Sequence, residues 1–490
     1  MPFLEPPNQI AELQAWIKSY LCPSENRLAF RAHQFTINGV TYPFVRNFHF
    51  AAVPDPPKDR RHDMYAGLYL TRPGDLMYFF QADPQWDLIN IDSRRGLRGI
   101  YRIVSRPFRD TSPIQDQNTG YRMLGSCPYC STFHSTLKSS CPKCDQEYPG
   151  FSIPSRERPY FELMLSSRLD LEPLIIFERA VSDERVYADM SDPGMVWIGR
   201  HDNQMGPGKG SSIRQLMPEE AVKIARLMLN EPEQRMSVPA KALYPNQIQA
   251  MTNEDGSPAE HLKIHYKQRT GKHELWHEDS LNFHIARVFD NQSSSFCGTL
   301  RHALGGIPWD QLEYASSMFP WGYTAGTSDF VLAFHNGDFR YSIVVMELKK
   351  GIADDDAFLQ ASLYVPWCVQ VLTQFAAVPP PEIRVLPVVI GRGLKSDVVK
   401  PSSYAYRAIF NSGVSVNVAV DSPRFFRYQP VDIYEHSGSH YARDIDYLDE
   451  SQGLGQISWS PPPGMVTTQV ERRWLLTGSW SAARQHERVF

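Results

Sequence analysis

Two apolar, β-rich runs in the C-terminal half of the chain flank the dipeptide Asn336-Gly337. This arrangement is the strongest short-range sequence signal for a β-hairpin. An antiparallel hairpin brings the start of its first strand, at Asp329, next to the end of its second strand, at Glu347 and Lys349. The pattern therefore predicts two carboxylates and a lysine gathered at one open end.

The second strand of this hairpin is expected to lie inside a sheet. The residues Ile343 to Met346 form a continuous apolar run directly before Glu347, which is typical of a strand buried on both faces. By the two-residue period of a strand, Glu347 and Lys349 share one face, and Leu348 points into a core on the other.

Helical spacing marks the elements around the hairpin. Upstream, the pattern predicts a helix over residues 273–288 that carries Glu278. Downstream, the acidic run 354–356 supplies capping carboxylates for a helix on which Gln360 and Tyr364 lie four residues apart. The order of helix, hairpin, helix and further strands indicates an α/β domain.

The N-terminal half shows a different pattern. Residues 1–25 predict a short amphipathic helix that ends near Pro23. From about 28 to 230 the pattern is one of short strands and turns, closing on a helix announced by Pro218-Glu219-Glu220. Residues 231–270 are polar and rich in turn signals, which indicates a linker.

Composition narrows the class of protein. The 490 residues suffice for two to four domains with separate cores, and 42% are hydrophobic and 21% charged. No apolar run approaches the ~20 residues of a membrane span, so we expect no contact with membranes. The N-terminus has neither a basic nor an apolar leader region, so we expect no signal peptide and a cytoplasmic location. The net charge of -4 argues against a uniformly basic surface but not against local nucleic-acid-binding patches.

Two carboxylates and a lysine at one strand end suggest metal-assisted chemistry. Asp329 and Glu347 offer the oxygen ligands that Mg²⁺ prefers, with waters completing the coordination. Such an ion polarises a phosphoryl oxygen and acidifies a bound water, while Lys349 can orient that water or stabilise developing charge. The alternative is an ordinary hairpin with surface charges at its end.

The order of these motifs resembles the PD-(D/E)XK nuclease superfamily, in the branch with a Gln-xxx-Tyr helix, and is similar to the archaeal mismatch-endonuclease type. The resemblance covers roughly residues 271–400. It implies that Asp329 and Glu347 bind Mg²⁺, with Mn²⁺ as an alternative, that the Leu348 carbonyl adds a ligand, and that Lys349 assists the water.

The same resemblance assigns two further roles. It implies that Gln360 orients the site and that Glu278 is the upstream acid, with Glu274 as the second candidate. The chain departs from the family pattern in one place, because Thr-Ser precedes Asp329 where the family has proline.

Four of the seven cysteines form two closely spaced CxxC pairs separated by ten residues, namely Cys127, Cys130, Cys141 and Cys144. Each pair presents two thiolates, and two pairs complete a closed tetrahedral zinc site. The spacing predicts a small structural zinc finger in a reducing compartment. The alternatives are a redox pair and a buried coincidence.

The pieces of the N-terminal half occur in a recognisable order. A Pro73-Gly74-Asp75 turn enters a strand, a second strand spans about 96–108, and Ser212 to Leu216 leads into the helix at Pro218. Composition alone supports a small β-barrel with a terminal helix. The order resembles the PUA-like superfamily, particularly EVE and YTH domains, over about 30–230, with the zinc finger as an insertion.

Modules of that family read modified bases in an aromatic cage, so the resemblance implies such a cage here. No motif identifies its walls; the candidate aromatic residues are Phe48, Tyr65, Tyr69, Trp86 and Trp197. Arg98 and Arg102 lie four apart, on one face of a strand, where they could contact phosphates. For each residue the alternative is an ordinary core or surface position.

We therefore expect a multidomain protein with a PUA/EVE-like β-barrel, a small four-cysteine zinc finger and an α/β PD-(D/E)XK nuclease domain. The expected parts are an N-terminal helix (1–27), the base-reading domain (28–230) with the finger (126–145), a linker (231–270), the nuclease (271–430) and an extension of unassigned role (431–490).

The predicted function is Mg²⁺-dependent DNA cleavage directed by a modified base, as in modification-dependent restriction. One alternative is a nuclease for RNA or structured DNA. The other is a non-catalytic nucleic-acid-binding protein that uses both folds as a platform. Because cutting both strands usually requires two active sites, a homodimer is one expected arrangement.

Overall fold

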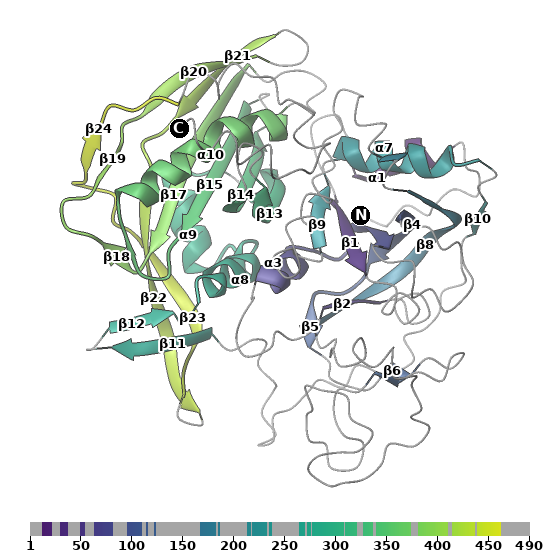
Figure 1. Ribbon diagram of the computed structural model, residues 1–490, viewed down its shortest axis with the longest axis horizontal. Coiled ribbons are helices and arrows are strands. Elements are labelled where there is room, and N and C mark those ends of the chain that lie inside the picture. Colours follow the sequence, from purple (N-terminus) through teal and green to yellow (C-terminus); the bar gives the residue numbers. More distant parts are fainter. Residues whose placement is uncertain are drawn as a thin grey trace, which may run out of the picture.

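The computed structural model describes the chain over residues 12–21, 30–37, 50–53, 63–81, 96–109, 114–115, 122–123, 167–182, 185–186, 213–216, 218–232, 235–237, 264–269, 272–275, 277–307, 309–320, 327–336, 340–373, 381–409, 414–436 and 439–461. These residues form two units, each built on one large sheet (Figure 1). Within the described residues, no helix is both long and apolar enough to cross a membrane.

The N-terminal unit contains an eight-stranded mixed sheet with the path β10-β8-β4-β3-β1-β9. Its strands are β1 (Ala32–Ile37), β2 (Phe50–Val53), β3 (Leu76–Gln81), β4 (Gly96–Ile103), β5 (Phe108–Arg109), β8 (Ser167–Val181), β9 (Ile213–Leu216) and β10 (Met236–Ser237), and β6 (Ile114–Gln115) pairs separately with β7 (Arg122–Met123). Its helices are α1 (Leu13–Leu21), α3 (Asp63–Tyr69) and α7 (Pro218–Leu229). The helix α7 begins at the predicted Pro218, and β3 follows the predicted turn at Gly74, whose φ of 97° suits glycine.

Alternation along β3 supplies cores on both sides of this sheet. Leu76, Tyr78 and Phe80 face the helices α1 and α7, where Ile17 and Ile224 complete one core. The residues between them, Met77 and Phe79, face the opposite core, which also includes Leu68 of α3. The predicted amphipathic helix at the N-terminus is thus part of this unit and packs on its terminal helix.

The C-terminal unit contains a ten-stranded mixed sheet with the path β12-β11-β23-β22-β17-β15-β14-β13, which β20 and β21 extend beside β17. Its strands are β11 (Ile264–Arg269), β12 (Lys272–Leu275), β13 (Leu312–Pro320), β14 (Thr327–Asn336), β15 (Arg340–Leu348), β17 (Glu382–Gly391), β20 (Tyr404–Ile409), β21 (Ser415–Val420), β22 (Arg424–His436) and β23 (Ser439–Asp449). Short strands pair outside it: β16 (Ile352–Ala353) with β18 (Gly393–Leu394), and β19 (Val399–Pro401) with β24 (Gly455–Ile457). Its helices are α8 (Asp279–Val288), α9 (Ser295–Ala303), the 3₁₀ helix η5 (Trp309–Gln311) and α10 (Asp355–Thr373).

Helices cover both faces of this sheet (Figure 1). On one face Val344, Met346 and Leu348 of β15 pack with α8 and α9. On the other face Ile343 and Val345 pack under α10. The strand β15 lies between β14 and β17, which confirms the prediction of a central strand, and two covered faces account for its continuous apolar run.

Two segments predicted from the sequence differ from the structure. The segment 231–270 contains β10 and β11 at its ends, and β11 pairs with β23, so it is not a linker throughout. The segment beyond 430 contributes the second half of β22 and all of β23 to the central sheet. β10 pairs with β8 and β11 with β23 across long stretches of sequence, and β22 joins the central sheet through β17, which local composition does not reveal.

The helix predicted over 273–288 is also shorter than expected. Its first part is the strand β12, which pairs with β11 from Arg269↔Lys272 to Tyr266↔Leu275. The helix α8 begins only at Asp279. Pairing with a neighbouring strand overrides the helical spacing of residues 273–278, because propensity is a weak prior when a tertiary partner is present.

The two units share apolar contacts through α3 and α8, which lie side by side (Figure 1). Ala66 and Leu70, around α3, belong to the core of the C-terminal unit, and Phe283 of α8 belongs to a core of the N-terminal unit. The side-chain amide of Gln215 in β9 bonds the backbone of β13 twice, at Glu313 O and Ala315 N, both at 3.0 Å. Separating the two units would therefore expose apolar and hydrogen-bonding groups of both.

Candidate active site

The hairpin formed by β14 and β15 positions the two predicted metal-binding carboxylates. Its pairing runs from Asn336↔Arg340 to Phe330↔Met346, so Asp329 and Glu347 are the next residues at the open end. Both strands continue as apolar runs that anchor these two residues in the centre of the sheet.

Face alternation places both carboxylates on the α10 side of the sheet. Asp329 shares its face with Val331, and Glu347 shares its face with Val345; both valines lie in the core beneath α10. Leu348 lies in the opposite core, as the sequence predicts.

The polar contacts of these residues link them into one cluster. The backbone N–H of Leu348 donates to Asp329 Oδ2 at 2.7 Å, and Lys349 Nζ lies 2.6 Å from Glu347 Oε1. Lys349 Nζ is also 3.4 Å from Gln360 Oε1 of α10. The structure therefore brings Asp329, Glu347, Lys349 and Gln360 together.

The upstream acid reaches the same cluster from the other side of the sheet. Glu278, immediately before α8, accepts a hydrogen bond from the backbone N–H of Lys350 at 3.1 Å. Glu274 lies in β12, where its Oε2 is 3.8 Å from Arg392 Nη1. Its other oxygen lies beside Gly351, two residues after Lys349.

Electrostatics within the cluster disfavour the charged carboxylates. Burial, followed by the charge of Glu347, raises the pKa of Asp329 well above its usual value. Burial also raises the pKa of Glu347 and of Glu278, although Lys349 opposes both shifts. Burial would lower the pKa of Lys349, but the surrounding carboxylates, with Glu347 the strongest, outweigh it and the net shift is upward.

The donor set fits a divalent cation held by few protein ligands. Glu347 is 5% exposed, and its Oε2 is a buried oxygen with no hydrogen-bond partner among the described residues. A cation beside this oxygen would satisfy it and relieve the repulsion from Asp329. In the described part of the chain, no three His, Cys, Asp or Glu side chains gather closely enough to hold a metal by themselves. Two carboxylates completed by water and a carbonyl oxygen are a common Mg²⁺ arrangement.

Two contributors at this site escaped the sequence analysis. Asn282 of α8 is buried, and its Nδ2 donates to the Asp329 carbonyl oxygen at 3.1 Å. Tyr428 of β22 donates from its hydroxyl to the Lys350 carbonyl oxygen and accepts from the Leu275 N–H at 3.3 Å. Asn282 follows Glu278 by four residues, one helical turn, and this spacing could have identified it. Tyr428 is far from the other site residues in the sequence, so no local pattern indicates it.

The predicted base-binding aromatics are only partly described. Tyr69 packs edge-on against Phe283 of α8, with ring centroids 5.0 Å apart, so it serves the junction between the units rather than a visible cage. The side chain of Tyr65 lies outside the described residues. So do the other candidates, Phe48, Trp86 and Trp197, and the predicted zinc ligands, Cys127, Cys130, Cys141 and Cys144.

The predicted phosphate contacts at Arg98 and Arg102 need correction. Both side chains are buried, at 1% and 2% exposure, and so cannot face a phosphate backbone. Arg102 instead bonds Glu172 Oε2 at 2.8 Å and the Tyr20 hydroxyl at 3.1 Å. Arg98 is the extra residue of a bulge in β4, so the spacing of four does not fix its face relative to Arg102, and both side chains are packed rather than solvated.

No family model and no curated protein matches this chain. The solved structure of the human THYN1 protein in complex with DNA containing 5-methylcytosine is similar over 41% of this chain and 99% of that chain, at 12% identity and a TM-score of 0.22. A protein from Pseudomonas syringae is similar over 40% and 99%, again at 12% identity and a TM-score of 0.22.

Proposed function

We propose that the protein is a Mg²⁺-dependent endonuclease of the PD-(D/E)XK type that cleaves DNA and is directed to its site by a modified base. The observation that carries the proposal is the convergence of Asp329, Glu347 and Lys349 at the end of a buried central strand. The unpartnered Glu347 Oε2 adds to it, because burying a carboxylate oxygen without a partner is costly unless a ligand compensates it.

In this proposal Asp329 and Glu347 hold the cation, and the Leu348 carbonyl is the third protein ligand. When bound, Mg²⁺ supplies Lewis acidity at a phosphoryl oxygen and lowers the pKa of a coordinated water. The hydrogen bond from Asn282 fixes the backbone of Asp329, and the Leu348 N–H fixes its carboxylate.

Lys349 is the group that acts on the substrate oxygens. Its raised pKa keeps it protonated at neutral pH, so it can donate hydrogen bonds to the attacking water or to the phosphate. Contacts with Glu347 and Gln360 hold its ammonium group at the open end of the hairpin. Glu278 accepts from the backbone N–H of Lys350 and so fixes the residue after Lys349. Its carboxylate also interacts electrostatically with Lys349.

We assign recognition of the modified base to the N-terminal unit. Phosphate contacts carry no sequence information, so the selectivity of a nuclease must come from elsewhere. The order of the Gly74-Asp75 turn, β3, β4, β9 and α7 supports this assignment through its resemblance to PUA-like readers. Cleavage of RNA or branched DNA as efficient as that of modified duplex DNA would favour the alternative substrate classes instead.

A cleavage assay with the full chain tests the proposal. Duplexes of one sequence, unmodified or carrying the common cytosine or adenine modifications, are incubated with Mg²⁺ or Mn²⁺, alongside RNA and branched DNA. We expect cation-dependent cleavage of one modified duplex, abolished in Glu347→Gln and retained in Glu435→Gln, an exposed glutamate of β22. Cleavage that survives Glu347→Gln would contradict the site, whereas equal cleavage of all duplexes would contradict only the reader.

The full chain is needed because the two units share their cores. A fragment ending near residue 240 would expose Ala66 and Leu70, and one starting near 260 would expose Phe283. Loss of activity in either fragment would report misfolding as readily as loss of recognition.

A further inference from the structure

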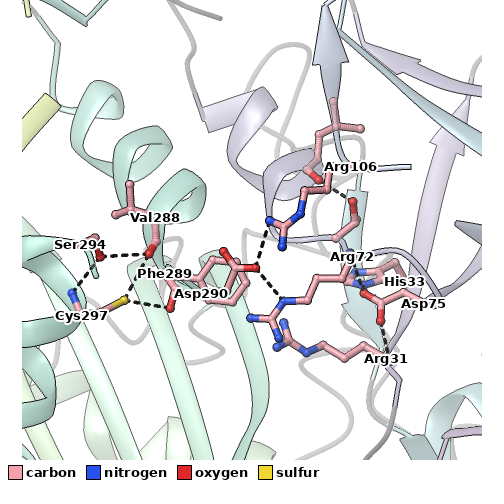
Figure 2. A network of polar contacts seen from close by, with 12 residues as sticks. Arg31, His33, Arg72, Asp75, Arg106, Val288, Phe289, Asp290, Ser294 and Cys297 are labelled. Carbon is pink, nitrogen blue, oxygen red and sulfur yellow. Dashed lines mark hydrogen bonds and ion pairs between the residues drawn. The ribbon is translucent and has the colours of Figure 1, made fainter. Parts of the chain in front are cut away.

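Three arginines of the N-terminal unit meet the C-terminal end of α8 at the junction (Figure 2). We call Arg31, Arg72 and Arg106 the junction arginines. Arg72 Nε lies 3.1 Å and Arg106 Nη1 3.3 Å from the same oxygen, Oδ2 of Asp290. The guanidinium carbons of Arg31 and Arg72 lie 5.4 Å and 4.9 Å from the ring centre of Phe289.

The backbone of the N-terminal unit fixes two of these arginines. Asp75 accepts hydrogen bonds from the N–H groups of Arg31 and Arg72, at 2.9 Å and 3.0 Å, and its Oδ2 lies 2.8 Å from His33 Nε2. Both chain segments are therefore anchored by one buried carboxylate, and the two guanidinium groups extend from it toward Asp290 (Figure 2).

The cluster has more hydrogen-bond donors than the protein satisfies. Arg31 is only 4% exposed, and its buried Nη1 has no hydrogen-bond partner among the described residues. Burial, followed by the like charge of Arg72, lowers the pKa of Arg31 to about 9. Three guanidinium groups thus converge near the carboxylate of Asp290, and Arg72 and Arg106 contact the same oxygen of it. Each guanidinium could engage an anion with two parallel donors.

The position of Asp290 is itself unfavourable. It follows directly after the end of α8, where the negative pole of the helix disfavours a carboxylate. Its side chain is 13% exposed, whereas that of Arg106 is 71% exposed, so an anion approaching from solvent meets Arg106 first. An oxyanion with three oxygens would satisfy the arginines better than this carboxylate does.

The other end of α8 leads to the proposed active site. Glu278 lies immediately before the helix, and the ten residues of α8 span about 15 Å. One turn of duplex DNA is about 34 Å long, so a duplex lying across the junction can reach both ends of the helix.

We propose that the junction arginines bind one phosphate group, supplied by the backbone of the nucleic acid, and that Asp290 occupies this site with its own carboxylate until the phosphate displaces it. The identity of the ligand rests on the proposed function, since a nuclease is what places a nucleic-acid backbone on this surface. The occupation by Asp290 rests on the geometry alone.

Binding of the full-length protein to a 20-base-pair duplex, without added Mg²⁺, tests the proposal independently of cleavage. Asp290→Asn removes the competing charge and should tighten binding about fivefold. Arg106→Ala should weaken binding about fivefold and reduce the slope of log K against log salt by about one. Asp421→Asn is the matched control, because Asp421 is paired with Arg384 at 2.8 Å within the C-terminal unit, and it should change neither quantity.

The direction of the change in duplex binding by Asp290→Asn distinguishes a phosphate-binding site from an ion pair that only joins the two units. Unchanged or weaker duplex binding would overturn the proposal. If Asp290 only holds the two units together, neutralising it does not improve binding of the duplex. If Asp290→Asn does not fold, an unchanged salt slope in Arg106→Ala overturns the proposal in its place.

A parallel arm uses inorganic phosphate as the probe and thermal unfolding as the readout. Phosphate that stabilises Asp290→Asn more than the wild type, together with the altered duplex binding, supports the site. Phosphate stabilisation with unaltered duplex binding overturns the assignment to a nucleic-acid backbone. An absence of cleavage activity would contradict the proposed function and leave these binding results standing.

Discussion

The carboxylates of Asp75 in the N-terminal unit and of Asp329 and Glu347 in the C-terminal unit have opposite electrostatic surroundings. Asp75 in the N-terminal unit accepts from two backbone N–H groups and contacts His33, and these partners with Arg31 bring its pKa below the usual value although burial would raise it. In the C-terminal unit, Asp329 and Glu347 repel each other, their pKa values are raised, and Glu347 Oε2 has no partner among the described residues.

This difference separates a buried charge that supports the fold from one that is kept for a ligand. Asp75 is compensated by the protein itself and fixes the ends of β1 and β3. The cluster at Asp329 is incompletely compensated, which costs folding free energy and is tolerated typically at functional sites. Substitution of Asp75 should therefore lower stability, whereas substitution of Asp329 or Glu347 should lower activity.

The largest expected effect is on catalysis. Glu347→Gln and Asp329→Asn should each lower cleavage by more than about a hundredfold, beyond the usual cost of losing an outer-shell partner of a metal. Neither substitution should lower the melting temperature measured without added divalent cation, because each removes a repulsive charge. Cleavage is measured on a duplex and unfolding by circular dichroism; a clear loss of stability with either variant would contradict the comparison.

The predicted zinc finger would be a third way of compensating charge, with four thiolates around one ion. Elemental analysis should find about one zinc per chain, and Cys141→Ser should lose it. Structural zinc supplies about 10–16 kcal/mol of apparent binding free energy in small fingers, so the finger should unfold locally. Cys22→Ser, at an isolated cysteine, is the control and should retain the metal; protein purified without chelator that lacks zinc would rule the finger out.

Asp75→Asn should destabilise the protein by about 3–5 kcal/mol, the usual result of breaking a buried charge pair. Denaturant unfolding measures this loss, and the exposed Asp310 supplies the control substitution, Asp310→Asn. A decrease in the free energy of unfolding of less than about 1 kcal/mol would indicate that the Asp75 charge is not well compensated and would contradict the comparison.

The pH dependence of stability sharpens the same point. Because the pKa of Asp75 is lower in the folded protein than in the unfolded chain, its stabilisation is complete above the unfolded value, about 3.9, and is lost as the pH falls through the folded value. The stability difference between wild type and Asp75→Asn should therefore shrink below about pH 4. A difference that instead grows on acidification would contradict the direction of the shift.

The smallest effect is expected at Gln360. Its Oε1 lies 3.4 Å from Lys349 Nζ, so Gln360→Ala should lower kcat about tenfold with little change in KM, through a less well-positioned ammonium group. Gln370→Ala, on the same helix but further from its start, should leave both constants unchanged. A change confined to KM would indicate that Gln360 binds substrate rather than positions the lysine.

Local pattern was enough to predict several elements and the centre of the candidate site. The Asn336-Gly337 signal and the flanking apolar runs predicted the hairpin of β14 and β15, and hence the proximity of Asp329 and Glu347. The α7 helix and the Gly74 turn were likewise predicted, because capping and turn preferences act over a few residues.

Only the tertiary structure decided which elements share a sheet and which charges are buried. Glu274 lies in a strand because β11 pairs with β12, and β22 and β23 belong to the central sheet although their composition suggested an extension. Arg98 and Arg102 are both buried, but no local signal shows that the strand carrying them is covered. The contacts of Arg72 and Arg106 with Asp290 join residues that are far apart in the sequence, 184 positions in the case of Arg106. Hydrophobic periodicity records which side of an element is apolar, whereas burial of a particular charge depends on which distant segment packs against it.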